Sequence, residues 1–382
     1  MKKVFTWMKS EAVLVIAWIL AVISAFFVLP DKQYLEYIDF RTLALLFCLM
    51  CVMAGLQKIG VFQWIAEALL AKVKNSGQLV LILVLLCFFF SMFITNDVAL
   101  IVFVPFTFAV LRLVGQDKWE QLLIPIVAMQ TIAANLGSML TPIGNPQNMY
   151  LCNLAGMGLG EFVLLMLPYT ALSLVIFIVW GVIKGRRCKD TLAISFAKRT
   201  SLKGKQGKLV AYLVLFVLCL LTVAKIIPYV WVLAAVVVIV FVLDKRVLLT
   251  VDYSLLLTFV GFFIFTGNIG RIPAVAELLK QLISGQEMLT TVVACQAMSN
   301  VPAAILLSGF TENIGVLIVA VNIGGLGTLI ASMASLISFK YVAREDGGRK
   351  GAYFRYFTLA NICFLAALVV LYIISGAALI GN

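Results

Sequence analysis

The sequence contains no histidine among its 382 residues. This absence excludes imidazole metal ligands, histidine proton relays and Ser-His-Asp catalysis. Charged residues are scarce: they make up 12% of the chain, whereas soluble domains contain about 25%. Hydrophobic residues account for 63%, above the roughly 45–50% of soluble domains. The composition therefore predicts a polytopic membrane protein.

Acidic residues are also few, at 17 against 29 basic ones, so the formal net charge is +12. Most Lys and Arg fall in a few loops, which is typical of membrane topology, so we expect the lipid bilayer and no nucleic acid as partner. No metal cluster and no nucleophile–base pair is visible. Cys48 and Cys51 lie in an apolar run, where thiols behave as small hydrophobes. We expect no enzymatic activity and no cofactor, except Na⁺ or H⁺ as a coupling ion.

Long apolar runs predict an all-α fold, because about 20 such residues cross the hydrocarbon core as a helix. The run after Met1-Lys2-Lys3 is longer than a signal-peptide core and is followed by other spans, so we expect an uncleaved first helix. Two charge-free regions with Gly and Pro in their middles, 121–160 and 313–339, predict interrupted spans. Uninterrupted spans are expected near residues 11–30, 41–57, 162–183, 208–227, 229–243, 250–267 and 356–379.

Two pairs of shorter apolar arms predict re-entrant helical hairpins. The arms are residues 79–94 and 98–111 around Asp97, and residues 288–298 and 301–310. At about 16 and 14 residues, the first pair is short for two independent crossings. Each pair is joined by polar residues, and non-helical backbone at depth is tolerated only when it is buried in protein or faces water.

The basic loops fix the expected topology. Residues 184–208 contain nine basic residues and one acid, and residues 340–355 contain five basic residues and two acids. Nine crossings and two hairpins put both segments in the cytoplasm and residues 31–41 outside, as the positive-inside rule requires. We therefore expect an inner or plasma membrane protein with a cytoplasmic N-terminus and an extracytoplasmic C-terminus.

The same order of features occurs twice. Asp39-Phe40 corresponds to Asp252-Tyr253, and Thr95-Asn96 corresponds to Ser299-Asn300. Because the matching spans run in opposite directions, the sequence predicts two inverted repeats with discontinuous helices, a design of secondary transporters. Residues 1–183 form the first repeat, with its hairpin tip near 95–97 and its helix break near 137–148. Residues 184–227 form a basic cytoplasmic linker with a linking helix. Residues 228–382 form the second repeat, with its tip near 299–301 and its break near 322–332.

Asp97 is the single charge in an apolar region. An ionised Asp at the centre of a bilayer costs about 2.5–3.5 kcal/mol on insertion scales. Two interpretations remain open: the carboxylate caps the second hairpin arm, or it binds Na⁺ or a proton. Other acidic and basic residues, Asp39, Lys58, Glu67 and Asp252, are expected to be solvated or structural.

Two hairpin tips and two helix breaks should converge on one site. Half-helix N-termini suit an anion, whereas unwound carbonyls suit a cation. Alternatives remain: Gly324-Gly325 is also typical of close helix packing, and Gly144-Asn145-Pro146 of a simple kink. The candidate substrate-binding residues are Thr95, Asn96, Thr141, Gly144, Asn145, Gln147, Asn148, Ser299, Asn300, Gly325, Gly327 and Thr328. The candidates for the coupling ion are Asp97, Asn96 and Asn300. No Lys or Arg lies in these four segments.

Three motifs are specific to a known family: Thr95-Asn96-Asp97, the run from Thr141 to Asn148, and Ser299-Asn300. With these motifs, nearly the whole chain resembles the ion transporter superfamily. That group includes citrate transporters, arsenite permeases, divalent-anion/sodium symporters and certain sodium/proton antiporters. In its dicarboxylate symporters both tips read Ser-Asn-Thr and bind carboxylate and sodium; here the third position departs at both tips. The first tip is closer to that of the arsenite permeases. The resemblance implies a scaffold part, a moving transport part and a homodimer.

The sequence thus predicts a secondary active transporter of a small inorganic or organic anion, coupled to Na⁺ or H⁺. Three alternatives stay open: export of arsenite or antimonite, Na⁺/H⁺ antiport through Asp97, and a passive channel. Two blocked hairpins in an inverted repeat argue against the channel.

Overall fold

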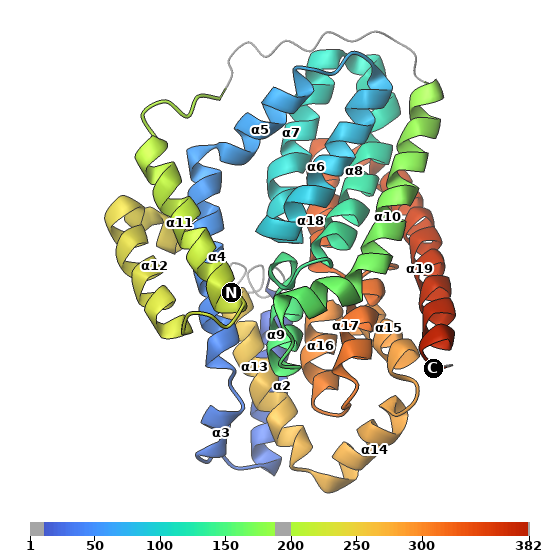
Figure 1. The fold of residues 1–382 in the computed structure, drawn as a ribbon. Coiled ribbons are helices and arrows are strands. Elements are labelled where there is room, and N and C mark those ends of the chain that lie inside the picture. Colours follow the sequence, from blue (N-terminus) through green and yellow to red (C-terminus); the bar gives the residue numbers. More distant parts are fainter. Residues whose placement is uncertain (1–10, 188–199, 381–382) are drawn as a thin grey trace.

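The computed structural model describes residues 11–187 and 200–380, without the side chains of residues 186–187 and 376–380. The segment Met1-Lys2-Lys3 and residues 188–199 of the predicted basic linker lie outside the described residues. Within the described part every regular element is a helix, which confirms the predicted all-α class (Figure 1). The first half comprises α2 (Ala12–Phe27), α3 (Gln33–Glu36), α4 (Phe40–Ile59), α5 (Val61–Leu70), α6 (Ser76–Ile94), α7 (Asn96–Val114), α8 (Gln116–Ser138), η1 (Pro142–Gly144), α9 (Pro146–Leu154) and α10 (Leu159–Arg187). The remainder comprises α11 (Gln206–Val223), α12 (Tyr229–Asp244), η2 (Lys245–Thr250), α13 (Tyr253–Gly270), α14 (Pro273–Ile283), α15 (Glu287–Met298), α16 (Asn300–Ser308), α17 (Ile314–Gly324), α18 (Met333–Glu345), η3 (Gly347–Arg349) and α19 (Lys350–Ile380).

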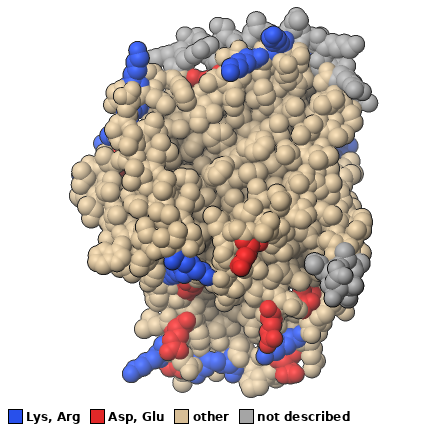
Figure 2. All heavy atoms as spheres, viewed as in Figure 1, with Lys and Arg blue, Asp and Glu red and all other residues tan. Residues whose placement is uncertain are grey.

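Eight helices of the described part are long and apolar enough to cross a membrane: α4, α6, α7, α8, α10, α11, α13 and α19. The outer helices expose large apolar side chains such as Val179, Val217, Trp231 and Val370. Figure 2 shows charged groups mainly towards the two ends of the visible face, with a broad, nearly uncharged band between them. A band of this kind suits contact with lipid, so the chain is a polytopic membrane protein.

The two predicted hairpins are present, but the first has longer arms than predicted. α6 and α7 contain 19 residues each, so both reach spanning length and the length argument for re-entry is wrong there. The difference arises because Asn75 caps α6 early, its side chain accepting from the amide of Gln78, and because α7 continues to Val114. In the second hairpin α15 and α16 contain only 12 and 9 residues.

The two hairpin tips have the same backbone geometry. Thr95 has φ 69° and ψ 152°, and Ser299 has φ 74° and ψ 158°. These angles are essentially confined to glycine, and a side chain there costs about 1–3 kcal/mol. Both residues immediately precede a helix N-terminus, at Asn96 and Asn300. The chain therefore reverses in the same way at both tips.

Both interrupted spans are also present. α8 stops at Ser138, and α9 starts at Pro146 after the short η1 turn; α17 stops at Gly324, and α18 starts at Met333. The two residues that precede the second half-helices match in backbone geometry, with φ −143° and ψ 143° at Asn145 and φ −140° and ψ 133° at Ser332. Proline and glycine make the first break unavoidable, as the sequence predicts.

The halves of the chain interlock. α2 packs on α13 and α12 packs on α4, while α9 contacts α16 and α18 contacts α7. In Figure 1 α5, α6 and α7 occupy the upper part of the molecule and α14, α15 and α16 the lower part. This reciprocity favours the predicted repeat, whose limits at residues 183 and 228 stay a prediction.

The charged loops lie at the two ends of the molecule, as the positive-inside pattern requires. Arg112 at the end of α7 pairs with Glu345, and Lys205 donates to the carbonyl oxygen of Ile59 over 3.0 Å. The described part of one basic segment therefore lies at the end of α4, where α5 begins, and that of the other at the end of α7; Figure 1 shows α5 and α7 in the same part of the molecule. At the other end Arg271 pairs with Asp31 over 2.7 Å.

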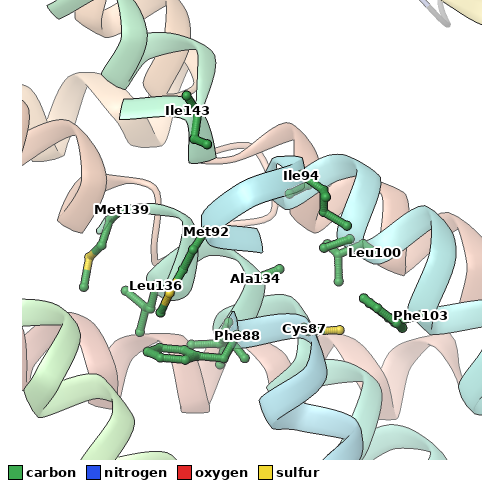
Figure 3. Packing of buried hydrophobic residues seen from close by; sticks show 14 of the residues in the cluster. Cys87, Phe88, Met92, Ile94, Leu100, Phe103, Ala134, Leu136, Met139 and Ile143 are labelled. Atoms are coloured by element: carbon green, nitrogen blue, oxygen red, sulfur yellow. The ribbon is translucent and has the colours of Figure 1, made fainter. Parts of the chain in front are cut away.

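An apolar core holds the first hairpin in position. Side chains of α6, α7 and α8 fill the space between these helices, among them Cys87, Phe88, Met92, Leu100 and Phe103 (Figure 3). α6 and α8 approach so closely that a Cβ on Gly137 would lie 2.0 Å from the carbonyl oxygen of Phe88. The tip is therefore fixed against the first half of the broken span.

Candidate functional site

Four helix N-termini lie close together at the middle of the fold: those of α7, α9, α16 and α18. The amide of Asn300 donates to the carbonyl oxygen of Ala331 over 3.0 Å, which joins the start of α16 to the start of α18. Asn96 and Ser332 both donate to Oδ1 of Asn135, over 2.9 and 3.0 Å, which joins the starts of α7 and α18. Each N-terminus is the positive end of a helix dipole, so this arrangement favours an anion.

A reciprocal asparagine network ties the two breaks together. Asn135 of α8 accepts from Ser332 over 3.0 Å and donates to Ser335 over 3.5 Å. Asn322 of α17 accepts from Asn145 over 3.4 Å and donates to Asn148 over 2.7 Å. All six side chains are buried. Each half thus places one asparagine between two polar side chains of the other half's break.

The spacing of these residues is the same in both halves. Asn145 and Asn148 follow Asn135 at the same intervals at which Ser332 and Ser335 follow Asn322. Asn135-Leu136-Gly137 matches Asn322-Ile323-Gly324 in the same way. Sequence reasoning named Asn322 only as part of the break and missed Asn135. A lone asparagine just before a Gly in an apolar helix was the available signal.

The same correspondence extends to the threonines of the breaks. Thr141 donates to the carbonyl oxygen of Met92 near the first tip, and Thr328 donates to that of Gln296 near the second over 3.5 Å. Gly144 must lack a side chain, because a Cβ would lie 2.1 Å from the carbonyl oxygen of Ser138. These contacts hold each hairpin to its own helix break.

Gln296, which sequence reasoning missed, organises the second break. Its side-chain amide donates to the carbonyl oxygens of Gly324 and Leu326, each over 2.9 Å, and accepts from the amide of Thr328 over 2.9 Å. Gly327 has φ 106°, and a Cβ there would lie 2.4 Å from the Oε1 atom of Gln296. Thr328 is exposed and does not line the cavity that contains Thr95 and Asp97. The amide thus occupies the unwound backbone of this break.

A cavity of about 520 Å³ lies beside the first tip. Thr95, Asp97, Ile143 and Pro146 line it from the hairpin and the first break. Leu46, Leu49, Met50, Ala54, Gln57 and Lys58 of α4, and Thr250, Asp252 and Leu255 around the start of α13, line it from the opposite side. A second hollow of about 380 Å³ between α4, α5 and α7 shares Gln57 and Ile101 with it.

Asp97 faces this cavity without a complete set of partners. Its backbone amide does not donate to the carboxylate; it donates to Oδ1 of the Asn96 side chain over 2.9 Å. The Oδ1 atom of Asp97 is buried and has no hydrogen-bond partner among the described residues, and the same holds for Oδ1 of Asn145 and Nε2 of Gln147. No capping bond from the Asp97 side chain is found in the described structure. These three unpaired atoms leave hydrogen-bonding capacity at the tip and the first break that a ligand or ion could satisfy.

Lys58 and Asp252, expected to be solvated or structural, also line the cavity. Asp252 does cap α13, accepting from the amide of Leu255 over 2.9 Å, and Lys58 pairs with Asp244 over 2.6 Å. Both therefore combine a structural contact with a place beside Asp97. Asp39 and Glu67 are structural as predicted: Asp39 caps α4, and Glu67 accepts from Thr200.

Known proteins resemble the chain over most of its length. The chain is 29% identical over 344 residues to an uncharacterized transporter of Methanocaldococcus jannaschii, and the alignment covers 90% of this chain and 91% of that protein. It is 30% identical over 326 residues to the inner membrane protein YbiR of Escherichia coli, covering 83% of this chain and 84% of that protein. A shorter match, 29% over 147 residues, relates 38% of the chain to 32% of the magnetosome protein MamN of Paramagnetospirillum magneticum. The family model described as citrate transporter matches residues 4–316. The chain is a membrane transporter and belongs to the citrate transporter family.

Proposed function

We propose that the protein is a secondary active transporter of a small anion, with Na⁺ or H⁺ as the coupling ion at Asp97. One observation carries the proposal: four helix N-termini converge, and two of them, the starts of α7 and α9, line a cavity that Asp97 also lines with one carboxylate oxygen unpartnered. The helix ends supply partial positive charge for the anion, and the carboxylate supplies a site for a cation.

Electrostatics link the two ligands. The carboxylate of Asp97 repels an anion bound nearby, by about 4 kcal/mol for unit charges about 4 Å apart at an effective dielectric of about 20. A bound Na⁺ or proton removes this repulsion. Since about 1.4 kcal/mol is a tenfold change in affinity, the coupling is worth up to about three orders of magnitude. Binding of one ligand then requires the other, which is what a symporter needs.

The charges around the cavity limit the substrate. Asp97 and Asp252 contribute two carboxylates, while Lys58 contributes the one basic side chain among the lining residues and is already paired with Asp244. A tricarboxylate would meet a net negative wall. The lining therefore favours a small anion of low charge, although the matching family model bears the name of citrate.

The neutral hydroxides of arsenite and antimonite would fit the same requirement, so the substrate panel includes arsenite. For the topology, we propose a cell membrane protein with a cytoplasmic N-terminus and an extracytoplasmic C-terminus. The shared end of the described parts of the two basic segments supports this orientation.

Uptake into proteoliposomes tests the proposal. The purified protein is reconstituted and offered radiolabelled citrate, succinate, small inorganic monoanions and arsenite, each under an imposed Na⁺ gradient, an H⁺ gradient or none. We expect one of the small, low-charge solutes to accumulate only with a cation gradient. Accumulation of citrate alone would contradict the substrate class, and equal flux without any gradient would contradict active transport.

A further inference from the structure

The short helix α9 is docked on α4 and α13. The side-chain amide of Asn153 donates to Oδ2 of Asp39, the cap of α4, over 2.8 Å. The ring of Tyr150 packs against Phe263 and Phe259 of α13, with ring centroids 5.2 and 6.5 Å apart. Together these contacts close one end of the interface between the first break and the helices α4 and α13.

The second half contains the counterparts of these residues. The offset that relates Asn135 to Asn322 also relates Asn153 to Lys340 and Tyr150 to Ile337. Lys340 and Ile337 both lie on α18. Asp39 corresponds to Asp252: both cap a helix through the amide three residues on, with φ −77° and −78° and ψ 83° at each. The counterpart of the Asp39–Asn153 bond is therefore a contact between Asp252 and Lys340.

In this structure the counterpart contact is open. Lys340 is exposed and forms no hydrogen bond or ion pair with any described residue. Among the described residues Asp252 accepts only from the amide of Leu255, and it also lines the cavity beside Asp97. The hydroxyl of Thr42 also donates to Oδ2 of Asp39. Leu255 takes the place of Thr42 after Asp252 and has no hydroxyl, so Oδ2 of Asp252 is left available.

The apolar contacts show the same asymmetry. Phe259 and Phe263 lie as far beyond their cap Asp252 as Leu46 and Met50 lie beyond Asp39. The first pair packs on Tyr150, but Leu46 and Met50 line the open cavity, and Ile337 is only partly buried. Two independent contacts are thus made by α9, and the corresponding two are open for α18.

We propose that an ion pair between Lys340 and Asp252 forms when the cavity beside Asp97 closes, and that the Asn153–Asp39 bond breaks in the same transition. The structure then represents one of two states that the halves of the chain exchange, with α9 docked in one and α18 docked in the other. Ile337 moves against Leu46 and Met50 in the closed state. This inference rests on the proposed transport function, because alternation between two states is what a secondary transporter requires.

Disulfide trapping in membrane vesicles tests the pair without any substrate. The variant with Asp252→Cys and Lys340→Cys is oxidised with copper phenanthroline, and the linked peptides are identified by mass spectrometry after proteolysis. We expect a 252–340 link, and also a 39–153 link in the variant with Asp39→Cys and Asn153→Cys. The control combines Asp252→Cys with Tyr341→Cys, because the next residue points about 100° away around α18. A 39–153 link with no 252–340 link, or equal linking at 341, overturns the proposal.

A second measurement keeps the test independent of the cysteine pair. Gln57→Cys places a thiol in the cavity wall, and its rate of reaction with a water-soluble methanethiosulfonate reports how long the cavity is open. Lys340→Gln should increase this rate several-fold by removing the closed-state ion pair, whereas Lys350→Gln, an exposed lysine near the same end, should leave it unchanged. An unchanged rate in Lys340→Gln contradicts the pair. Since neither readout measures uptake, failure of the proposed symport leaves both interpretable.

Discussion

Asp97 is the residue on which the coupling depends. In Asp97→Asn the side chain keeps its shape but loses the charge that repels the anion and attracts the cation. We expect uptake to lose its dependence on the Na⁺ or H⁺ gradient, because the repulsion of about 4 kcal/mol that the cation must neutralise is gone. Initial uptake rates with and without each gradient measure this. Asp117→Asn, an exposed acid in the first turn of α8, is the matched control and should retain gradient dependence.

Gly137 sets the distance between α6 and α8. A Cβ would lie 2.0 Å from the carbonyl oxygen of Phe88 and 2.6 Å from the hydroxyl of Ser91, so the helices must separate in Gly137→Ala. We expect a loss of about 1–3 kcal/mol, the usual cost of overpacking, seen as a lower melting temperature in detergent. Gly160→Ala in α10 has no atom within 4 Å of the added Cβ and should melt like the wild type. Equal melting of both variants would show that the two helices can separate freely.

At the residue scale, sequence reasoning located those polar groups that interrupt an apolar run. Asp97, Asn96 and Asn300 were visible because hydrophobic residues surround them on both sides. Lys58 and Asp252 were not assigned to the site because they lie at helix ends, where solvation is the ordinary explanation. Only the fold brings these ends to the cavity wall.

The hairpin is the element with the clearest internal strain. Thr95 and Ser299 adopt backbone angles that favour glycine, at a cost of about 1–3 kcal/mol each. We expect Thr95→Gly to raise the melting temperature by removing this cost, and to slow uptake because the tip becomes more mobile and loses its hydroxyl. Thr95→Ala keeps the strain and loses only the hydroxyl, so it should slow uptake without stabilising the protein. A Thr95→Gly protein that melts at the wild-type temperature would mean that the tip stores no strain.

Element limits were harder to predict than element types. The hairpins and breaks followed from Pro, Gly and polar residues within apolar runs. The arms of the first hairpin were predicted too short because apolar content alone defined them, whereas the helix extends through the Asn75 cap at one end and through Arg112 at the other. Caps and terminal charges lengthen a helix beyond its apolar part.

At the scale of the whole molecule, the reciprocal contacts were beyond reach of the sequence. The composition predicts the membrane class, and the order of features predicts two similar halves. Neither says that Asn135 of one half contacts Ser332 and Ser335 of the other, because these contacts join residues about 200 positions apart. The matching spacing of Asn135 and Asn322 could have suggested the network, but only once both had been recognised as equivalent.

This network makes a prediction about how the halves stay together. Asn135→Ala and Asn322→Ala each leave buried polar partners in the opposite half unpaired, and an unsatisfied buried group costs about 1–3 kcal/mol. Each variant should therefore melt several degrees below the wild type. Asn361→Ala is the control: that side chain is equally buried, but within the described structure it donates only to Phe357 of its own helix, so no hydrogen bond between the described halves is lost. Its melting temperature should fall less.

The double variant separates a joint network from two local ones. If the two asparagines hold the same interface, the second substitution acts on an interface that the first has already loosened, and the combined loss should be smaller than the sum of the single losses. Strictly additive losses would mean that the two contacts act independently. Because each asparagine joins one broken helix to the other, a joint network would make the two breaks move as one unit, which is the condition for a single transport site formed by both halves.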